Sequence, residues 1–258
     1  MDYLLICTVS LFAAGLTLFS GFGLGTLLAP VFAIFFPLEL ALALTAIVHL
    51  LNNIFKLGLV GKFAVKDMVI KFGIPAMIAS FAGAFLLNSL GELPVVHTYL
   101  LLGKNVNLTL LNLVIGALIA FFALFELIPR LSKLTLDKKY LVMGGLLSGF
   151  LGGLSGNQGA LRSVFLLRAG LSKESFIGTG VVIACMVDVA RLIIYSEKIA
   201  KEWNHLDFLL LFSAVCCAFV GSYIGSKFIT KMTFSGLQLF VGILLIVLAV
   251  AIGGGLVG

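Results

Sequence analysis

The chain has 258 residues, of which 61% are hydrophobic and 11% are charged, and its mean hydropathy is +1.22. An ordinary globular domain has about 25% charged residues, so this composition excludes a soluble protein and predicts a polytopic membrane protein without a sizeable extramembrane domain. The net charge of +6 comes from basic residues between apolar segments, which is the positive-inside pattern and gives no reason to expect nucleic acid as a partner.

The first half of the chain contains a helix that glycines interrupt. An apolar run over residues 3–20 leads into the sequence SGFGLG at residues 20–25, and a shorter apolar run follows over residues 26–36. Lipid cannot satisfy the N–H and C=O groups of backbone that leaves helical geometry, so the interruption must be buried in protein or face a cavity. Longer runs that predict membrane-spanning helices follow at residues 38–55, 68–90 and 108–128.

The second half repeats this order. The sequence GGLSGNQG at residues 152–159 separates two short apolar runs, and three long runs follow at residues 171–195, 208–229 and 237–257. A shift of 134 residues places Gly25 on Gly159 and Thr45 on Thr179. We therefore predict an all-α protein of two inverted repeats, although a chance likeness between two glycine-rich tracts is the alternative. The expected divisions are a first transmembrane repeat at 1–130, a cytoplasmic linker at 131–139 and a second transmembrane repeat at 140–258.

Charge placement bears on the path of the broken helices. Basic residues flank the connection near residues 56–71 and fill the linker, so both of these connections are expected in the cytoplasm. Re-entrant hairpins at the two breaks leave fewer Lys and Arg residues outside than single crossings do, and they make the repeats inverted, as in many secondary transporters. A single crossing by each broken segment is the alternative. Lys56, at the end of its apolar run, is expected to be an interfacial anchor.

The breaks supply the first candidate binding residues. An anion inside a membrane needs donors in place of water, and the N-terminus of a helix offers unpaired N–H groups and a positive dipole end. Close helix packing is the alternative role for the glycines, and helix capping is the alternative for the two amides. The substrate-binding candidates at the breaks are Gly23, Gly25, Thr26, Asn157, Gln158 and Gly159.

Three further side chains are candidates for contact with an anion. Arg162 follows the second break and has planar donors that suit a pair of anion oxygens, with snorkelling to the headgroups or pairing with a carboxylate as the alternative. Thr45 and Thr179 occupy matching positions in the two repeats, where a hydroxyl can donate to substrate or to a carbonyl one turn back.

Ionisable residues within apolar runs are candidates for coupling or gating. Asp188 and Arg191 are three residues apart on one helix face, which predicts an ion pair, with a proton-coupling carboxylate as the alternative. His49 and Asn52 lie in the first-repeat run, where a histidine can titrate near neutral pH and couple transport to protons. Ordinary packing is the alternative for His49.

These motifs resemble the sulfite exporter TauE/SafE family of anion transporters. The resemblance rests on GFGLG at residues 21–25, ALT at 43–45, GNQGALR at 156–162, GTG at 178–180 and DVARLIIY at 188–195. It implies a carrier in the inner membrane of a prokaryote that exports sulfite or organosulfonates. The chain has Phe22, Asn157 and Gln158 where many members have consecutive glycines.

The sequence as a whole predicts a secondary transporter that works by alternating access. Its expected partners are a small anion, protons and the lipid bilayer, with no cofactor and no metal, and a homo-oligomer is compatible with the sequence. An enzyme is not expected, because the sequence has no P-loop, metal-binding cluster or catalytic triad pattern. An anion channel and a carrier for a small organic carboxylate are the alternatives.

Overall fold

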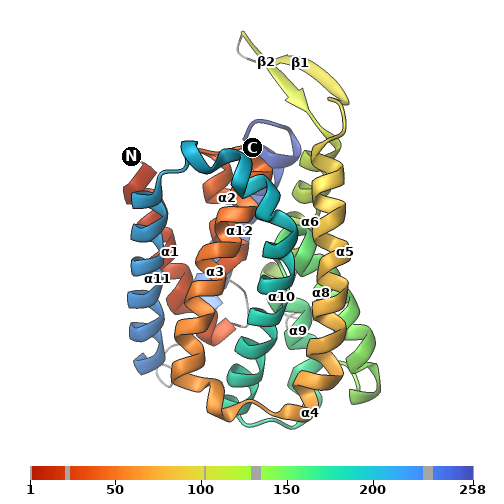
Figure 1. Cartoon of the computed structure of the whole chain (residues 1–258), viewed down its shortest axis with the longest axis vertical. Coiled ribbons are helices and arrows are strands. Elements are labelled where there is room, and N and C mark those ends of the chain that lie inside the picture. The colour runs from red at the N-terminus through yellow and green to blue at the C-terminus, as the bar shows by residue number, and fades with distance from the viewer. Residues whose placement is uncertain (1, 21–23, 102, 129–134, 229–234, 258) are drawn as a thin grey trace.

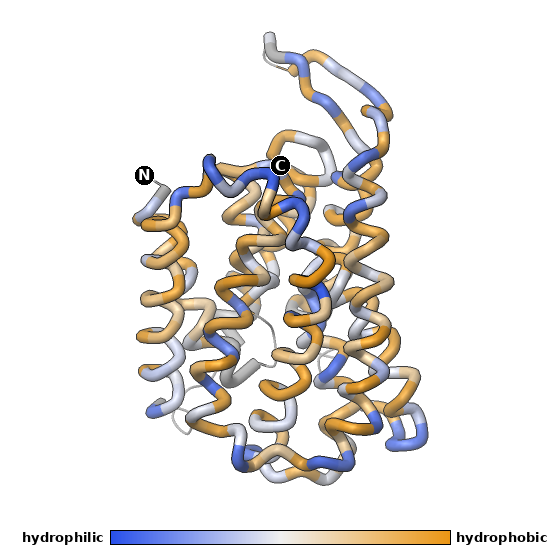
Figure 2. The backbone as a smooth tube through the Cα atoms, in the orientation of Figure 1, coloured by the Kyte–Doolittle hydropathy of each residue, from blue (hydrophilic) through white to orange (hydrophobic). Residues whose placement is uncertain are grey.

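A computed structural model of the chain describes residues 2–20, 24–101, 103–128, 135–228 and 235–257. Helices make up most of these residues, which confirms the expectation of an all-α membrane protein (Figure 1). Within the described residues, the helical segments long and apolar enough to cross a membrane are Leu38–Phe63, Lys66–Gly91, Lys173–Glu202 and Phe208–Lys227. Figure 2 shows apolar residues along the helices and most hydrophilic residues near the two ends of the bundle.

The elements follow one another with short connections. The first half contains α1 (Asp2–Ser20), α2 (Leu24–Ala33), α3 (Leu38–Val60), α4 (Lys66–Met68), α5 (Ile74–Gly91), β1 (His97–Leu101), β2 (Lys104–Leu108) and α6 (Leu110–Leu127). The second half contains α8 (Leu141–Ser155), α9 (Gly159–Leu166), α10 (Lys173–Glu202), α11 (Phe208–Phe228) and α12 (Ser235–Gly253). Single 3₁₀ turns lie at Gly61–Phe63, Lys138–Tyr140, Leu167–Ala169 and Trp203–His205, and a π-helical turn at Val69–Gly73 joins α4 to α5.

The first broken helix enters and leaves the bundle at one end, which we call the upper end after its place in Figure 1. At the start of α1, Tyr3 Oη donates to Asp207 Oδ2 at 2.5 Å, just before α11 begins. At the start of α3, Glu39 pairs with Lys198 near the end of α10. Both ends of the α1–α2 segment therefore lie at the upper end. The turn between these helices, residues 21–23, lies outside the described residues.

The second broken helix enters and leaves at the opposite, lower end. The backbone N–H of Leu136, before α8, donates to Val164 O near the end of α9 at 3.1 Å. The backbone N–H of Val65, after α3, donates to Thr179 Oγ1 near the start of α10 at 3.0 Å. The structure thus has the re-entrant hairpins that the charge pattern favours, and they enter from opposite ends (Figure 1).

Helices of the two halves begin at corresponding positions in the sequence. With the shift of 134 residues, the starts of α2, α3 and α5 fall within one residue of the starts of α9, α10 and α11. Helices α6 and α12 do not keep this register. Paired hairpins from opposite ends are what inverted repeats require, but the duplication and its boundaries stay predictions.

A β-hairpin at the upper end was not expected. Strands β1 and β2 pair antiparallel, with His97 opposite Leu108 and Leu101 opposite Lys104. The tyrosine of β1, Tyr99, donates from Oη to Gly254 O at 2.6 Å and so ties the hairpin to the end of α12. Polar and apolar residues alternate over Asn105–Leu108 of β2, a pattern of period two that fits a strand, whereas β1 does not alternate. The all-α expectation missed this pattern because it counted only long apolar runs.

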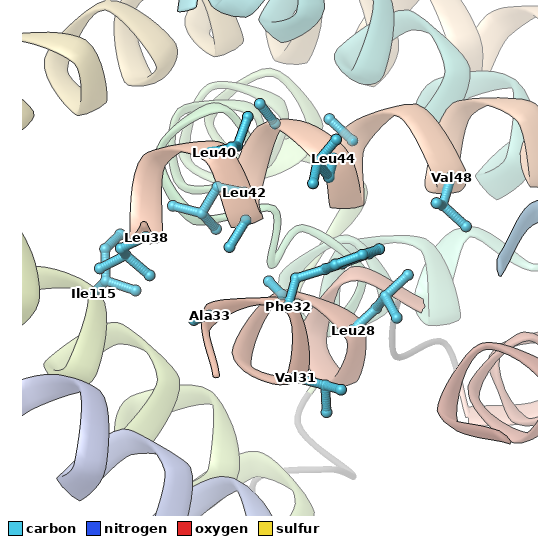
Figure 3. Packing of buried hydrophobic residues seen from close by; sticks show 14 of the residues in the cluster. Leu28, Val31, Phe32, Ala33, Leu38, Leu40, Leu42, Leu44, Val48 and Ile115 are labelled. Carbon is cyan, nitrogen blue, oxygen red and sulfur yellow. The ribbon is translucent and has the colours of Figure 1, made fainter. Parts of the chain in front are cut away.

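Helix α2 is short but buried on almost all sides. Figure 3 shows Leu28 and Phe32 pointing from α2 toward α3, where Leu42 and Leu44 lie, while Val31 points away from α3. Because lipid tails are as apolar as these side chains, close van der Waals packing holds such helices together.

Glycines allow α5 and α8 to approach closely. Gly145, Gly149 and Gly153 recur every fourth residue along the buried face of α8. A Cβ atom added to Gly149 would lie 2.0 Å from Ala76 O, and one added to Gly153 would lie 2.1 Å from Ser80 O. Only glycine fits at either position while the helices keep this distance.

We predict that Gly149→Ala lowers the stability of the protein in detergent by about 1–3 kcal/mol, the usual cost of overpacking. Gly58→Ala is the matched control, because a Cβ atom at Gly58 has nothing within 4 Å. Thermal unfolding followed by circular dichroism measures both variants. Equal melting temperatures for the two would contradict the close α5–α8 contact.

Candidate functional site

The two breaks meet inside the bundle. A Cβ atom on Gly25, in the first turn of α2, would lie 3.1 Å from Gly156 O in the second break and 3.7 Å from Thr45 Cγ2 on α3. Thr26 is buried beside Gly25, and Gly159 is buried where α9 begins. Gly23, the other candidate at the first break, lies outside the described residues. The start of α2 therefore touches the turn that precedes α9.

A left-handed glycine makes the second break. Helix α8 ends at Ser155, and the next residue, Gly156, has a φ of +78° and donates its N–H to Gly152 O at 2.9 Å. Side chains other than glycine rarely adopt this φ, so the turn requires glycine here. Asn157 and Gln158 form the short connection to α9, and Ser148 Oγ donates to Gln158 O at 3.0 Å. The turn is thereby fixed to α8.

Arg191 on α10 faces this turn. Its Nη1 atom would lie 2.8 Å from a Cβ atom at Gly156, and its side chain is fully buried. The Nε atom donates to Asp188 Oδ1 at 3.0 Å, and Nη2 lies 2.8 Å from the same oxygen, so the ion pair expected from the spacing is present. Within the described residues, Nη1 has no hydrogen-bond partner, whereas Nη2 is engaged in the ion pair with Asp188.

The amides of the second break also hold unpaired polar atoms. Gln158 Nε2 and Asn157 Oδ1 are buried and have no hydrogen-bond partner among the described residues. A buried polar group without a partner costs about 1–3 kcal/mol, so most such groups in folded proteins are paired. Unpaired donors from Arg191 and Gln158 at one turn indicate a place for a ligand with acceptor oxygens.

Tyr195 fixes the turn relative to Arg191. It lies one helical turn after Arg191 on α10 and is buried, and its phenol donates to Gly153 O in the last turn of α8. Sequence reasoning did not single out Tyr195 as a site residue. Its position four residues after Arg191 was the available signal, because residues i and i+4 lie on one helix face.

Asp188 joins α3 to α10. Its Oδ2 atom lies 2.6 Å from His49 Nδ1 and accepts from Asn53 Nδ2 at 3.2 Å, while Oδ1 accepts from Arg191. All of these groups are buried. The carboxylate is therefore held by a permanent cation on one side and by a histidine that can gain or lose a proton on the other.

The remaining candidates lie around this centre. Arg162 is partly buried, donates from Nη1 to Gln158 Oε1 at 3.5 Å, and lies with Nε against Gly180. Thr45 donates to Ala41 O at 2.8 Å, one turn back, so its hydroxyl proton is not available to a substrate oxygen. Thr179 accepts from Val65 N at the lower end of the bundle, away from the turn at Gly156.

Asn52 and Lys56 form a separate polar contact on α3. Asn52 and Ser222 of α11 are hydrogen-bonded at 2.7 Å. When the Asn52 amide is oriented so that both its oxygen and its nitrogen have partners, the oxygen accepts from Lys56 Nζ at 3.2 Å. Lys56 is only 3% exposed, so the expectation of an interfacial anchor is wrong. His49, Asn53 and Lys56 recur at helical spacing on one face, and this polar stripe was the signal that Lys56 faces inward.

A family model described as sulfite exporter TauE/SafE matches residues 6–252 of the chain. The match includes both hairpins and every residue of the site described above. No curated protein and no solved structure matches the chain.

We predict that Tyr195→Phe lowers the free energy of unfolding by about 1–3 kcal/mol, because Gly153 O is left buried without its donor. Tyr223→Phe on α11 is the control, since Tyr223 is exposed. Chemical denaturation in detergent measures both. A Tyr195→Phe variant as stable as the control would show that the phenol does not hold the turn.

A second prediction concerns the buried ion pair. Asp188→Leu leaves the Arg191 charge buried without its partner and should destabilise the protein by about 3–5 kcal/mol. Adding Arg191→Met should restore part of that loss, because no isolated charge is then left at this position. A double-mutant cycle measures the coupling, and additive losses would argue against the pair.

Proposed function

We propose, from the premise that the chain belongs to the sulfite exporter TauE/SafE family, that it exports a small sulfur oxyanion across the cytoplasmic membrane of a prokaryotic cell. Members of this family are transporters and not enzymes, and the apolar helices make this chain a multi-pass membrane protein. Sulfite and organosulfonates are the substrates that we propose.

The observation that carries the proposal is the buried, unpaired donor set at the second break. Arg191 Nη1 and Gln158 Nε2 are donors only, so they bind acceptor oxygens. A guanidinium binds two oxygens of an oxyanion side by side, and the N-terminus of α9 adds the positive end of a helix dipole. The first turn of α2, at Gly25, lies against Gly156 O in the second break.

Two further basic side chains lie near the centre. Lys56 and Arg162 lie close enough to interact electrostatically with each other, and Arg162 also with Asp188. Apolar surroundings strengthen such interactions because the local dielectric constant is low. Arg162 can guide an anion between the lower end of the bundle and the turn at Gly156.

The two hairpins provide a means of alternating access. Each reaches the shared centre from a different end, so movement of one hairpin against the other half of the protein opens the centre to that end. Export of an anion is favoured by a negative cell interior by about 2.3 kcal/mol per charge per 100 mV. The proposed carrier can therefore work without ATP.

His49 is the proposed coupling residue. It contacts Asp188, and Arg191 and Lys56 also lie within electrostatic range of its ring. A proton on His49 strengthens its pairing with Asp188 and adds a positive charge beside the anion. Proton movement on this residue would thus be linked to anion binding, with Asp188 and Arg191 as the groups that transmit the change.

We predict saturable sulfite flux in proteoliposomes, with a KM raised about tenfold or more by Gln158→Leu, because a hydrogen bond to a charged group is worth about 1.5–3 kcal/mol. Lys71→Ala is the control, since Lys71 is exposed and, within the described residues, pairs with Asp67 one helical turn before it. Non-saturating flux would favour a channel. Flux of acetate but not of sulfite would favour a carboxylate carrier.

We also predict that His49→Gln removes the dependence of flux on a pH gradient while flux driven by membrane potential continues. Gln keeps a donor for Asp188 but cannot take up a proton. Flux that still follows the pH gradient in this variant would show that a residue other than His49 couples transport to protons.

A further inference from the structure

The unpaired buried atoms of the protein are concentrated at one turn. Within the described residues, the buried side-chain atoms with neither a hydrogen bond nor an ion pair are Ser10 Oγ, Asn157 Oδ1, Gln158 Nε2 and Arg191 Nη1, while Arg191 Nη2 pairs with Asp188. All except Ser10 Oγ belong to the loop between α8 and α9 or to the arginine that faces it. These unpaired atoms therefore indicate which donor and acceptor groups a ligand at the turn would need.

This set contains both donors and an acceptor. The Arg191 nitrogens donate only, and Gln158 presents Nε2 because Arg162 occupies its Oε1 atom. Asn157 Oδ1 is a carbonyl oxygen, which accepts only. An anion whose oxygens bear no hydrogen can satisfy the donors but leaves Asn157 Oδ1 without a donor.

We infer that the turn at Gly156 selects an oxyanion that carries its own hydrogen-bond donor, a hydroxyl group or a protonated oxygen, which Asn157 Oδ1 accepts. The inference rests on the proposed function and makes its substrate class narrower. Hydrogen sulfite and hydroxylated sulfonates belong to this class, whereas sulfate and simple alkanesulfonates do not.

A buried acceptor atom makes a site discriminate strongly against ligands that lack a hydrogen-bond donor. A site with a buried polar atom rejects a ligand that leaves this atom unpaired more strongly than a ligand that differs in size by one methylene. Asn157 is buried, so water cannot replace the missing donor without taking space from the ligand.

The test compares 2-hydroxyethanesulfonate with ethanesulfonate, which differ only in the hydroxyl group. Binding to the purified full-length protein is measured by isothermal titration calorimetry, and competition with labelled sulfite is measured in proteoliposomes. We expect the hydroxylated sulfonate to bind about tenfold or more tightly. In Asn157→Leu the ratio should fall to about one, and in Gln158→Leu both affinities should fall while the ratio persists.

Each outcome has a distinct meaning. Equal binding of the two sulfonates by the unaltered protein would overturn the inference and leave the proposed anion transport standing. A preference that survives in folded Asn157→Leu would also overturn it, because the acceptor would then lie elsewhere. Binding of neither sulfonate and of no sulfite would overturn the proposed function together with the inference.

Discussion

Lipid offers no hydrogen bonds, and this constraint governs both broken helices. A helix that stops inside a membrane must have its free backbone groups covered by protein or by a bound polar ligand. The chain meets this demand by bringing the two breaks together, with Gly25 of one hairpin against Gly156 of the other. We propose that the anion binds where the two breaks meet.

Charge at this meeting point is balanced through one carboxylate. Asp188 pairs with Arg191 on its own helix and with His49 on α3, so it links the second break to the first repeat. Arg191 uses one side of its guanidinium for this pair and leaves Nη1 toward the turn. The same arginine is therefore both a structural partner and the proposed anion ligand, and a change in His49 protonation reaches it through one shared carboxylate.

The sequence predicts the parts of this arrangement that depend on local spacing. Glycine runs mark the breaks, basic connections favour hairpins, and a separation of three residues predicts the Asp188–Arg191 pair. It does not reveal the His49–Asp188 contact, because those residues are 139 apart and meet only through the packing of α3 against α10. The burial of Lys56 was missed for a similar reason, since a cation at the end of an apolar run resembles an anchor until the neighbouring helices are in place. The β-hairpin was missed because β1 does not alternate between polar and apolar residues and the alternation in β2 is short.

The central claim is that an oxyanion is held between Gly25, Gln158 and Arg191 at the junction of the two hairpins. The most direct measurement is a crystal structure of the protein with selenite, a sulfite analogue whose selenium atom is located by its anomalous scattering. The account predicts one strong anomalous peak within hydrogen-bond distance of Arg191 Nη1 and Gln158 Nε2. A selenium peak elsewhere in the bundle, with these two atoms still unpaired, would contradict it.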